Sequence, residues 1–407
     1  MGKPKIRFKG YEDAWEQRKL DGWGTFYYGR SCPKWSVTED ATIPCIRYGE
    51  LYTKFGAKID RVYSYTNMPP ENLRFSKGTE VLIPRVGEDP MDYNHCTWLS
   101  MPDVAIGEMI SVFNTDNNPL FTATMFNATL QNEFAMRVEG GSVTNLYFEK
   151  LKNIEVSFPS IQEQEKIAAY FENLDHLITL HQRKCEETKS LKKYMLQKMF
   201  PENGKCVPEI RFSGFSDAWE QRKLEEYLGV SKEKNRDESF GKDDVLSVSG
   251  EYGIVNQIEF QGRSFAGASV ANYGVVEGGD VVYTKSPLKS NPYGIIKTNK
   301  GKTGIVSTLY AVYKPKNNVG AEFVQIYFEL DSRMNSYMHP LVNKGAKNDM
   351  KVSDENALKG SVIFPKIDEQ KAISKYFAHL DHLITLHQHK CDELQKLKKF
   401  MLQNMFV

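Results

Sequence analysis

The most regular alternation of apolar and polar positions lies in residues 161–200. Apolar or weakly polar side chains recur there at alternating steps of four and three residues, and the segment contains neither Pro nor Gly. This period predicts a long amphipathic helix whose apolar stripe packs against a partner helix. The segment returns at 367–406, where 26 of 40 positions are identical at an offset of 206. The second copy is the obvious partner, so we expect two long helices that pack on each other.

The residues predicted to form the interface of this helix pair are those on the two stripes. In the first copy they are Ile167, Phe171, Leu174, Ile178, His181, Leu191 and Met195. In the second copy they are Ile373, Phe377, Leu380, Ile384, His387, Leu394 and Met401. Each copy also has a Cys four residues after its stripe His, on the same helix face, and two such His/Cys pairs could in principle bind zinc. We favour ordinary packing positions for them and expect no metal site.

A second repeat precedes each helix. Residues 4–20 and 208–224 share the pattern IRF…DAWEQRKL, with 13 of 17 positions identical at an offset of 204. The chain therefore consists of two tandem units that meet near residue 203. Between their shared ends lie two inserts of similar length, 21–157 and 225–363, which hardly resemble each other. A constant frame around two unlike inserts indicates one kind of task performed on two different targets.

Both inserts have the composition of many short strands. Runs of Val, Ile, Tyr and Phe such as 80–84, 279–284 and 304–313 are broken by Gly, Asn, Asp and Pro, and helices are expected at 119–134 and 321–337. We therefore predict an α+β protein. It has two globular α/β domains separated by two long, coiled-coil-like helices, in a pseudo-twofold tandem repeat. The predicted segments are 1–160 for the first domain, 161–200 for the first helix, 201–366 for the linker and second domain, and 367–407 for the second helix.

Composition adds limits on location and chemistry. The net charge of +1 gives no support to a generally basic nucleic-acid coat, although local basic patches remain open. The six cysteines stand singly with no CxxC pair, which is typical of a reducing compartment. There is no apolar run of the ~20 residues needed to span a bilayer, and the N-terminus lacks the apolar core of a signal peptide. We expect a cytoplasmic protein without membrane contact.

The layout and several local phrases resemble the specificity subunit of Type I restriction-modification systems. These phrases are IPCIRYGELY, VYTKSPLKSNPYG and the FP…EQ…I…LD…I start of each long helix, and the resemblance covers essentially the whole chain. It implies that each globular domain reads one half of a split site in double-stranded DNA. It also implies that the antiparallel helices set the spacing and dock two modification (methyltransferase) subunits, which a restriction (translocase and nuclease) subunit joins.

The same resemblance implies that this chain has no catalytic activity and no cofactor. S-adenosylmethionine, ATP and Mg are expected on the partner subunits. The motifs agree, because Asn291-Pro292-Tyr293 is one Pro short of an adenine methyltransferase motif. Gly294 and Gly301 are seven positions apart, whereas a P-loop needs five. A self-contained methyltransferase is therefore disfavoured, while a scaffold whose inserts bind proteins stays open.

Candidate DNA contacts are Lys, Arg, Asn, Ser and Tyr side chains in polar breaks next to predicted strands, because such groups bind phosphates and base edges. In the first insert they are Arg47, Tyr48, Tyr52, Lys54, Arg85 and Arg137. In the second insert they are Ser249, Tyr252, Lys285, Ser286, Lys289, Asn291, Tyr293, Lys344, Lys347, Asn348 and Lys351. We favour the loop 285–293 as a group, since two prolines stiffen it and lower the entropic cost of binding.

Overall fold

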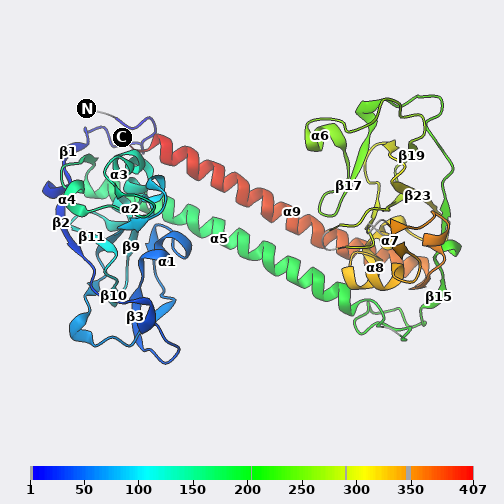
Figure 1. Cartoon of the computed structure of the whole chain (residues 1–407), viewed down its shortest axis with the longest axis horizontal. Coiled ribbons are helices and arrows are strands. Elements are labelled where there is room, and N and C mark those ends of the chain that lie inside the picture. The colour runs from blue at the N-terminus through cyan, green and yellow to red at the C-terminus, as the bar shows by residue number, and fades with distance from the viewer. Residues whose placement is uncertain (1–2, 203, 289–290, 345–349, 407) are drawn as a thin grey trace. The chain divides into compact units, whose positions relative to one another are not determined.

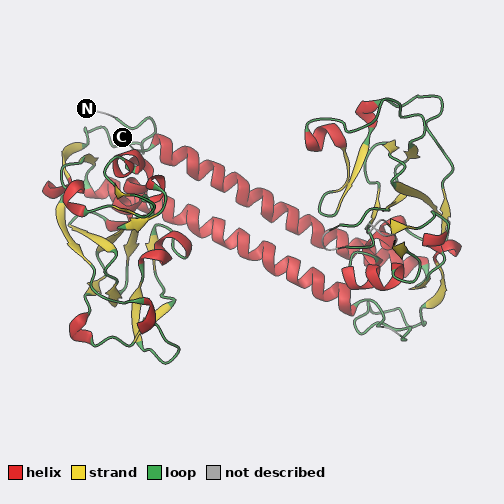
Figure 2. Ribbon diagram, in the orientation of Figure 1, coloured by secondary structure: helices red, strands yellow, loops and turns green. Residues whose placement is uncertain are grey.

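A computed structural model describes residues 3–202, 204–288, 291–344 and 350–406. It confirms the α+β class. The strands lie in two globular domains, and the two long helices lie outside the sheets (Figure 2). The chain divides into two compact units. Unit 1 comprises Met1–His181 with His389–Val407, and unit 2 comprises Gln182–Gln388. Each unit thus contains one domain, the beginning of one long helix and the end of the other.

The domain of unit 1, in which Figure 1 labels β2, β11 and β9, is built on a five-stranded sheet in the order β2-β11-β7-β9-β4. Its strands are β2 (Gly24–Tyr28), β11 (Ile110–Thr115), β7 (Glu80–Pro84), β9 (Thr97–Leu99) and β4 (Lys58–Ile59). All five residues of β7 are buried, as expected for a central strand. The predicted helix at 119–134 forms as two helices, α2 (Pro119–Thr129) and α3 (Gln131–Ala135). Helix α2 begins where the Asn118 side chain accepts a hydrogen bond from Phe121 N (2.9 Å).

The domain of unit 2 repeats this core with almost no sequence identity. Its sheet has the order β16-β23-β20-β21. The strands are β16 (Leu228–Val230), β23 (Tyr310–Pro315), β20 (Val281–Thr284) and β21 (Ile296–Thr298). They pair antiparallel, as the corresponding strands of unit 1 do. The predicted helix at 321–337 is again two helices, α7 (Ala321–Tyr327) and α8 (Asp331–Met338).

The two domains differ in what is inserted between the strands of this core. In unit 1, residues 30–77, called outgrowth 1, contain β3 (Ile43–Ile46), α1 (Tyr48–Thr53), β5 (Ser64–Thr66) and β6 (Phe75–Lys77), and these strands join β10 (Pro102–Ile106) in the order β5-β3-β10-β6. In unit 2, residues 231–276, called outgrowth 2, contain β17 (Leu246–Ser249), β18 (Gly253–Asn256), α6 (Gln257–Gln261) and β19 (Gly274–Val276), which pairs with β22 (Gly304–Val306). The unlike inserts of the sequence are thus unlike outgrowths on a common core.

Short elements complete each domain. Unit 1 also contains β8 (Val86–Gly87), β12 (Glu139–Gly140), β13 (Thr144–Asn145) and α4 (Phe148–Leu151). Unit 2 also contains the pair β24 (Asn343–Lys344) and β25 (Met350–Lys351).

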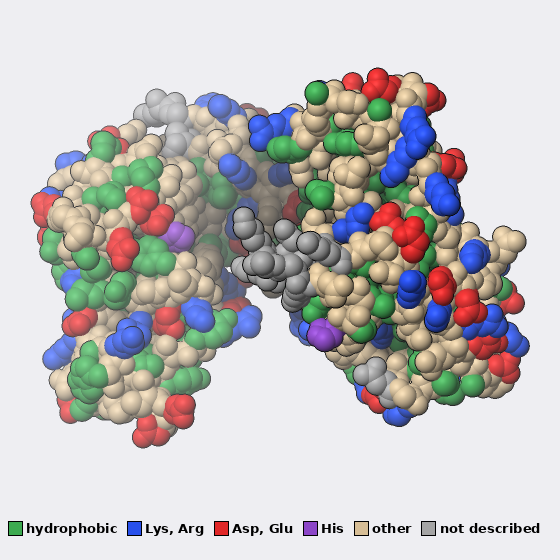
Figure 3. All heavy atoms as spheres, turned by 45° about the vertical axis from the view of Figure 1, so that its right-hand side comes forward, with side chains coloured by type: hydrophobic (Ala, Val, Ile, Leu, Met, Phe, Trp, Pro, Cys, Tyr) green, Lys and Arg blue, Asp and Glu red, His purple; other side chains and the backbone are tan. Residues whose placement is uncertain are grey.

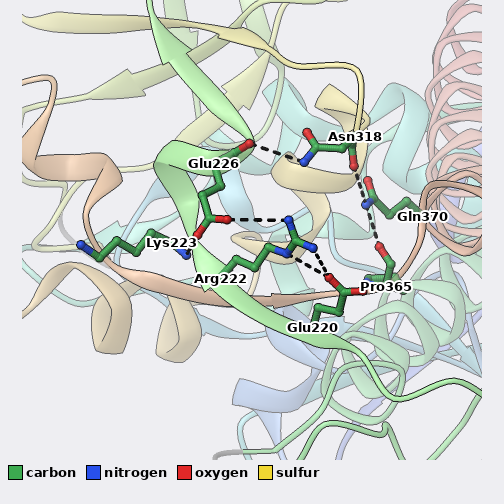
Figure 4. A network of polar contacts seen from close by, with 7 residues as sticks. All are labelled: Glu220, Arg222, Lys223, Glu226, Asn318, Pro365 and Gln370. Carbon is green, nitrogen blue, oxygen red and sulfur yellow. Dashed lines mark hydrogen bonds and ion pairs between the residues drawn. The ribbon is translucent and has the colours of Figure 1, made fainter.

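The repeated EQRK sequence is an edge strand in both units. Strand β1 (Glu16–Lys19) pairs with β14 (Glu155–Phe158), and β15 (Glu220–Lys223) pairs with β26 (Ser361–Phe364) in the same register. The Trp before each strand is buried. On β15, the Arg222 guanidinium donates to Glu220 (Nε to Oε2, 2.9 Å) on the exposed face (Figure 4). The motif therefore ties the chain that enters each domain to the chain that leaves it.

Two matching ion pairs fix the start of each long helix. Arg7 binds Glu163 with two parallel hydrogen bonds of 2.7 and 2.8 Å, and Arg211 binds Glu369 in the same way at 2.7 Å for both bonds. Both carboxylates are almost completely buried. Such paired, charge-assisted bonds are specific in geometry. Because each Arg lies in the repeated IRF segment, that segment and the long helix form one frame in each unit.

The glutamine that follows each of these glutamates anchors the domain helices. Gln370 donates to the carbonyls of Asn318 (3.2 Å) and Pro365 (2.9 Å), as Figure 4 shows, and accepts from Gly320 N (3.0 Å). In unit 1, Gln164 similarly accepts from Asn118 N at 2.9 Å. The start of α7 and the start of α2 are thereby held against the first turn of a long helix.

The long helices are α5 (Ile161–Lys198) and α9 (Ile367–Asn404), each of 38 residues. Within unit 1 the rings of Phe171 and Phe406 stack with centroids 5.7 Å apart, and within unit 2 Phe200 lies 6.2 Å from Phe377. A second contact in each unit runs the opposite way along the two helices: Asp175 pairs with Lys398 in unit 1, and Asp381 pairs with Lys192 in unit 2. The predicted antiparallel pairing is therefore present in each unit.

Most predicted stripe residues are buried or half-buried, but one assignment is wrong. Leu191 is 45% exposed, and Lys192 takes the buried position. Seven residues after Cys185, a helix has turned about two full times and returns to the same face, whereas six residues leave Leu191 well off that face. The stripe position in this turn is therefore Lys192, one residue after the predicted Leu191.

Candidate nucleic-acid interface

Helix α1 brings three of the predicted DNA contacts together. Buried strand β3 leads directly into Arg47, whose backbone N–H donates to Glu50 Oε2 (2.9 Å) at the helix start. Tyr48 is exposed on the first turn. Lys54 follows the last turn, with its Nζ 5.5 Å from the centre of the Tyr63 ring. A short helix on a rigid strand thus presents Arg47, Tyr48 and Lys54 at the surface of outgrowth 1.

The other candidates of unit 1 have partners inside the domain. The Tyr52 hydroxyl donates to Val86 O (3.0 Å), and burial raises the pKa of this phenol. The Arg85 guanidinium lies 4.9 Å from the centre of the Tyr28 ring. Arg137 donates to the carboxylate of Glu133 one turn earlier (2.5 Å). These three residues stabilise the domain, and none is exposed as Tyr48 is.

In outgrowth 2, Ser249 and Tyr252 flank the turn of the β17–β18 hairpin. The Ser249 hydroxyl accepts hydrogen bonds from Glu251 N (3.3 Å) and Tyr252 N (3.1 Å), so its role is to form the turn. Tyr252 is exposed and packs against Phe260 at 5.2 Å between ring centres. Of the two, Tyr252 alone offers a side chain to a partner.

The loop 285–293 corrects part of the sequence interpretation. Asn291 is only 7% exposed and donates to Asp331 Oδ1 at 2.7 Å, while Tyr293 is 9% exposed and lies edge-on to His339. The backbones of Leu288 and Asn291 exchange two hydrogen bonds of 3.0 and 3.1 Å. The structure therefore contradicts Asn291 and Tyr293 as surface contacts, because the loop directs them inward.

Of the remaining candidates of unit 2, Lys285 and Ser286 are partly accessible. The Lys285 ammonium is half-buried and pairs with Asp354 at 2.9 Å, and Ser286 is half-buried next to it. Lys344 and Lys351 lie on the paired strands β24 and β25. Lys289, Lys347 and Asn348 lie outside the described residues.

The two outgrowths differ in charge. Residues 30–77 contain eight Lys and Arg against five Asp and Glu, a net charge of +3. Residues 231–276 contain five against seven, a net charge of −2. On the face drawn in Figure 3, basic and acidic side chains are interspersed and form no single basic field. Attraction to a phosphate backbone is therefore expected from outgrowth 1, whereas unit 2 would depend on the lysines of its core loops.

Two absences concern only the part of the chain that the structure describes. Across these residues, no three His, Cys, Asp or Glu side chains come together as a metal site would require. Cys185 on α5 instead directs its thiol toward Ile384 O (3.9 Å) on α9. Among the described helices, none is long and apolar enough to cross a membrane.

Comparison with known proteins adds three findings. A family model for the type I restriction modification DNA specificity domain matches residues 103–190, which run from β10 into α5. The putative type I restriction enzyme MjaX specificity subunit of Methanocaldococcus jannaschii is 26% identical over 268 residues, which is 61% of this chain and 58% of that relative's length. The crystal structure of a type I restriction-modification S subunit from M. genitalium covers 100% of this chain and 99% of its own, with a TM-score of 0.60.

That crystal structure shares only 14% of its sequence with this chain, so it speaks for the fold alone. It does so over the full length, including the duplicated frame. The family model adds the passage from domain to long helix, which contains the FP…EQ start of α5. Residues 103–190 match the family model of the type I restriction modification DNA specificity domain, and the resemblance of this chain to type I specificity subunits is confirmed.

Proposed function

We propose that this chain is the DNA specificity subunit of a type I restriction-modification complex, in which each domain reads one half of an asymmetric, bipartite site in double-stranded DNA. One observation carries the proposal. The two units share a sheet order, an Arg–Glu ion pair and a Gln anchor, yet bear unlike outgrowths. A shared core keeps two readers in equivalent positions relative to their helices, and unlike outgrowths give them different targets.

The long helices would set the distance between the half-sites. At ~1.5 Å per residue, 38 residues extend over about 57 Å. Each helix begins in one unit and ends in the other, and both ends are packed into buried clusters. An element that is long, regular and anchored at both ends suits the role of a spacer.

The same helices expose apolar side chains at matching positions. Leu191 and Tyr194 of α5 are exposed in unit 2, and Leu397 and Phe400 of α9 occupy the equivalent positions, 206 residues later, in unit 1. Residues three apart lie on one helix face, and adjoining exposed apolar side chains are a feature of docking sites. Because the two patches are near-identical, two copies of one partner fit them, and we assign them to the two modification subunits.

Substitution of one patch tests this assignment. Leu191→Ala with Tyr194→Ala should leave folding intact and reduce the co-purified modification subunits from two to one, measured by native mass spectrometry. The matched pair Leu397→Ala with Phe400→Ala should do the same, and all four changes together should remove both copies. Retention of two copies by the fourfold variant would refute the docking assignment.

In this proposal the chain performs no catalysis. Methylation with S-adenosylmethionine would belong to the modification subunits, and ATP- and Mg-dependent translocation and cleavage to the restriction subunit. The complex would act in the cytoplasm, where its DNA substrate lies. The chain's own contribution is the choice of sequence.

Methylome sequencing tests the proposed function. A host that expresses this chain with its cognate modification subunit is compared with a host that lacks the chain. We expect a new bipartite motif with two different halves and a methylated adenine in each. A symmetric motif would show that the two domains do not act together in one chain. If no new methylation appeared, and the purified chain showed no salt-dependent DNA binding, the scaffold alternative would replace the proposal.

A further inference from the structure

Outgrowth 1 exposes a tryptophan to an unusual degree. The chain has five tryptophans, all within the described residues, and Trp35 is 72% exposed. Trp15 and Trp219 are buried, and Trp23 and Trp98 are half-buried. A large ring that contributes nothing to a core and stays in water is characteristic of a binding surface, where Trp and Tyr are enriched among the residues that dominate affinity.

Two further exposed rings lie on, or just before, the strand that is bonded to the Trp35 turn. Trp35 precedes Ser36, whose hydroxyl accepts from Thr66 Oγ1 (2.8 Å), and Ser36 O accepts from Asn67 N (3.0 Å). These bonds hold the Trp35 turn against the end of β5. Tyr65 on β5 is 42% exposed, and Tyr63 just before it is 50% exposed. We call Trp35, Tyr63 and Tyr65 the aromatic edge.

The aromatic edge is continuous with the surface that α1 presents. The Tyr63 ring lies 5.6 Å from Phe55, which follows α1, and the Lys54 ammonium lies 5.5 Å from the same ring. The Ser64 hydroxyl between the two tyrosines donates to Glu50 Oε1 of α1 (2.8 Å). Strand β5 is the outer strand of its four-stranded sheet, so no further strand covers this edge.

The charges around the edge decide which partner fits. Arg61 is strongly exposed, and Lys34, the residue before Trp35, is also exposed. Lys34 and Arg61 are close in sequence to Trp35 and Tyr63, Lys54 lies over the Tyr63 ring, and outgrowth 1 as a whole carries +3. Duplex DNA offers phosphates to such cations and flat or methyl-bearing base edges to the rings. Outgrowth 2, at −2, lacks this match despite its own exposed rings.

We propose that the aromatic edge of Trp35, Tyr63 and Tyr65 enters a groove of the first DNA half-site and extends the reading surface of α1. The cations near these rings hold the phosphates. The rings contact base edges, above all the thymine methyl group, or fill the space beside a deformed base step. This inference rests on the proposed function, and it names the residues that discriminate sequence in the first domain.

Hydroxyl-radical footprinting of the assembled complex tests the placement. Oxidation of Trp35, Tyr63 and Tyr65 is followed by mass spectrometry with and without duplex DNA that carries the methylated motif. We expect DNA to protect all three rings several-fold. Tyr147, an exposed ring of the same domain outside outgrowth 1, is the internal control and should not change.

Substitution tests the energetic role. Trp35→Ala with Tyr65→Ala should weaken binding to cognate DNA roughly 5- to 30-fold, the usual range for an interface aromatic, and should relax base preference in the first half-site only. The salt dependence of binding should keep its slope, because the rings neutralise no phosphate. Tyr147→Ala should bind as the wild type does. The melting temperature should change by only a few degrees, since Trp35 is largely exposed and Tyr65 about half exposed.

The outcomes separate the two proposals. Protection with weakened, less selective binding supports the aromatic edge. Specific DNA binding with no protection and unchanged affinity in the double variant overturns it while the specificity function stands. Absence of specific DNA binding by the wild-type complex overturns both.

Discussion

The duplicated helices contain a matched experiment on buried charge. Lys192 of α5 lies between two carboxylates, with its Nζ 2.5 Å from Glu329 and 2.6 Å from Asp381. At the equivalent position 206 residues later, Lys398 of α9 pairs with Asp175 alone. The Lys192 side chain is 11% exposed and the Lys398 side chain 28% exposed. The same repeat therefore holds a buried ion-pair network in unit 2 and a more accessible pair in unit 1.

We expect Lys192→Ala to lower the free energy of unfolding by about 2–3 kcal/mol. Removal of one partner of a buried pair strands the other charge, which costs about 3–5 kcal/mol when burial is complete. The value is reduced here because Asp381 is 43% exposed and water can solvate it. Lys398→Ala breaks a pair of surface character and should cost about 0–1 kcal/mol.

Urea denaturation of the full chain, followed by circular dichroism, measures both variants. Because the main cost comes from the stranded Glu329, the double variant Lys192→Ala with Glu329→Gln should recover part of the loss. Equal costs for Lys192→Ala and Lys398→Ala would refute the reasoning. So would a double variant that is no more stable than Lys192→Ala alone.

Three further predictions concern pH, the frame and the corrected loop. Burial disfavours the charged form of Lys192, but Glu329 and Asp381 outweigh this effect and raise its pKa. The contribution of Lys192 to stability should therefore be complete below about pH 10, the pKa of a lysine in the unfolded chain, and should disappear as pH rises through the pKa in the folded state. The stability difference between the wild type and Lys192→Ala, followed against pH, measures this. Arg211→Ala leaves Glu369 buried and should cost about 3–5 kcal/mol in urea, whereas Arg222→Ala, an exposed ion-paired control, should match the wild type; equal effects would contradict the frame. Asn291→Ala should lower the free energy of unfolding by about 1–3 kcal/mol, because it removes the hydrogen bond to Asp331. A variant as stable as the wild type that recognises a different DNA sequence would instead support Asn291 as a DNA contact.

The sequence was most informative where a pattern is local and periodic. Both long helices and their stripes through Phe171 and Phe377 follow from apolar positions at alternating steps of four and three residues. Their antiparallel pairing was implied by the family resemblance and not by the period. The error at Leu191 has the same origin, since an error of one residue moves a side chain by 100° around a helix. The helices of each domain were also expected, although the break between α2 and α3 was not.

Contacts between segments that are far apart in the sequence could not be predicted from it. Asn291 looks like a loop surface residue until Asp331, 40 positions away, is known to accept its hydrogen bond. The sequence did not show that the two inserts share a core. Phe113 on β11 and Tyr313 on β23 occupy matching places in the two sheets, but the sequences of the two inserts are unlike. The Arg7–Glu163 ion pair could have been predicted, because both residues and their counterparts Arg211 and Glu369 belong to the repeated motifs.

Among the candidate DNA contacts, the sequence identified residues of a suitable chemical type but did not show which of them are accessible. Arg47, Tyr48 and Lys54 are accessible around α1, whereas Tyr52 and Arg137 have the same chemistry and are engaged within the domain. The exposed ring of Trp35 was missed because a tryptophan is ordinarily assigned to a core. Only burial distinguishes these cases.

One measurement tests the central claim that two separate readers are held apart by the helices. Seven residues of helix-forming sequence are inserted into both α5 and α9 near their midpoints, which keeps both stripes in register and adds about 10 Å. The methylome is then sequenced in a host where the lengthened chain still co-purifies with its modification subunits. We predict the same two half-sequences separated by a spacer longer by at most about three base pairs, at ~3.4 Å per step. An unchanged spacer, or a change in either half-sequence, would contradict the account.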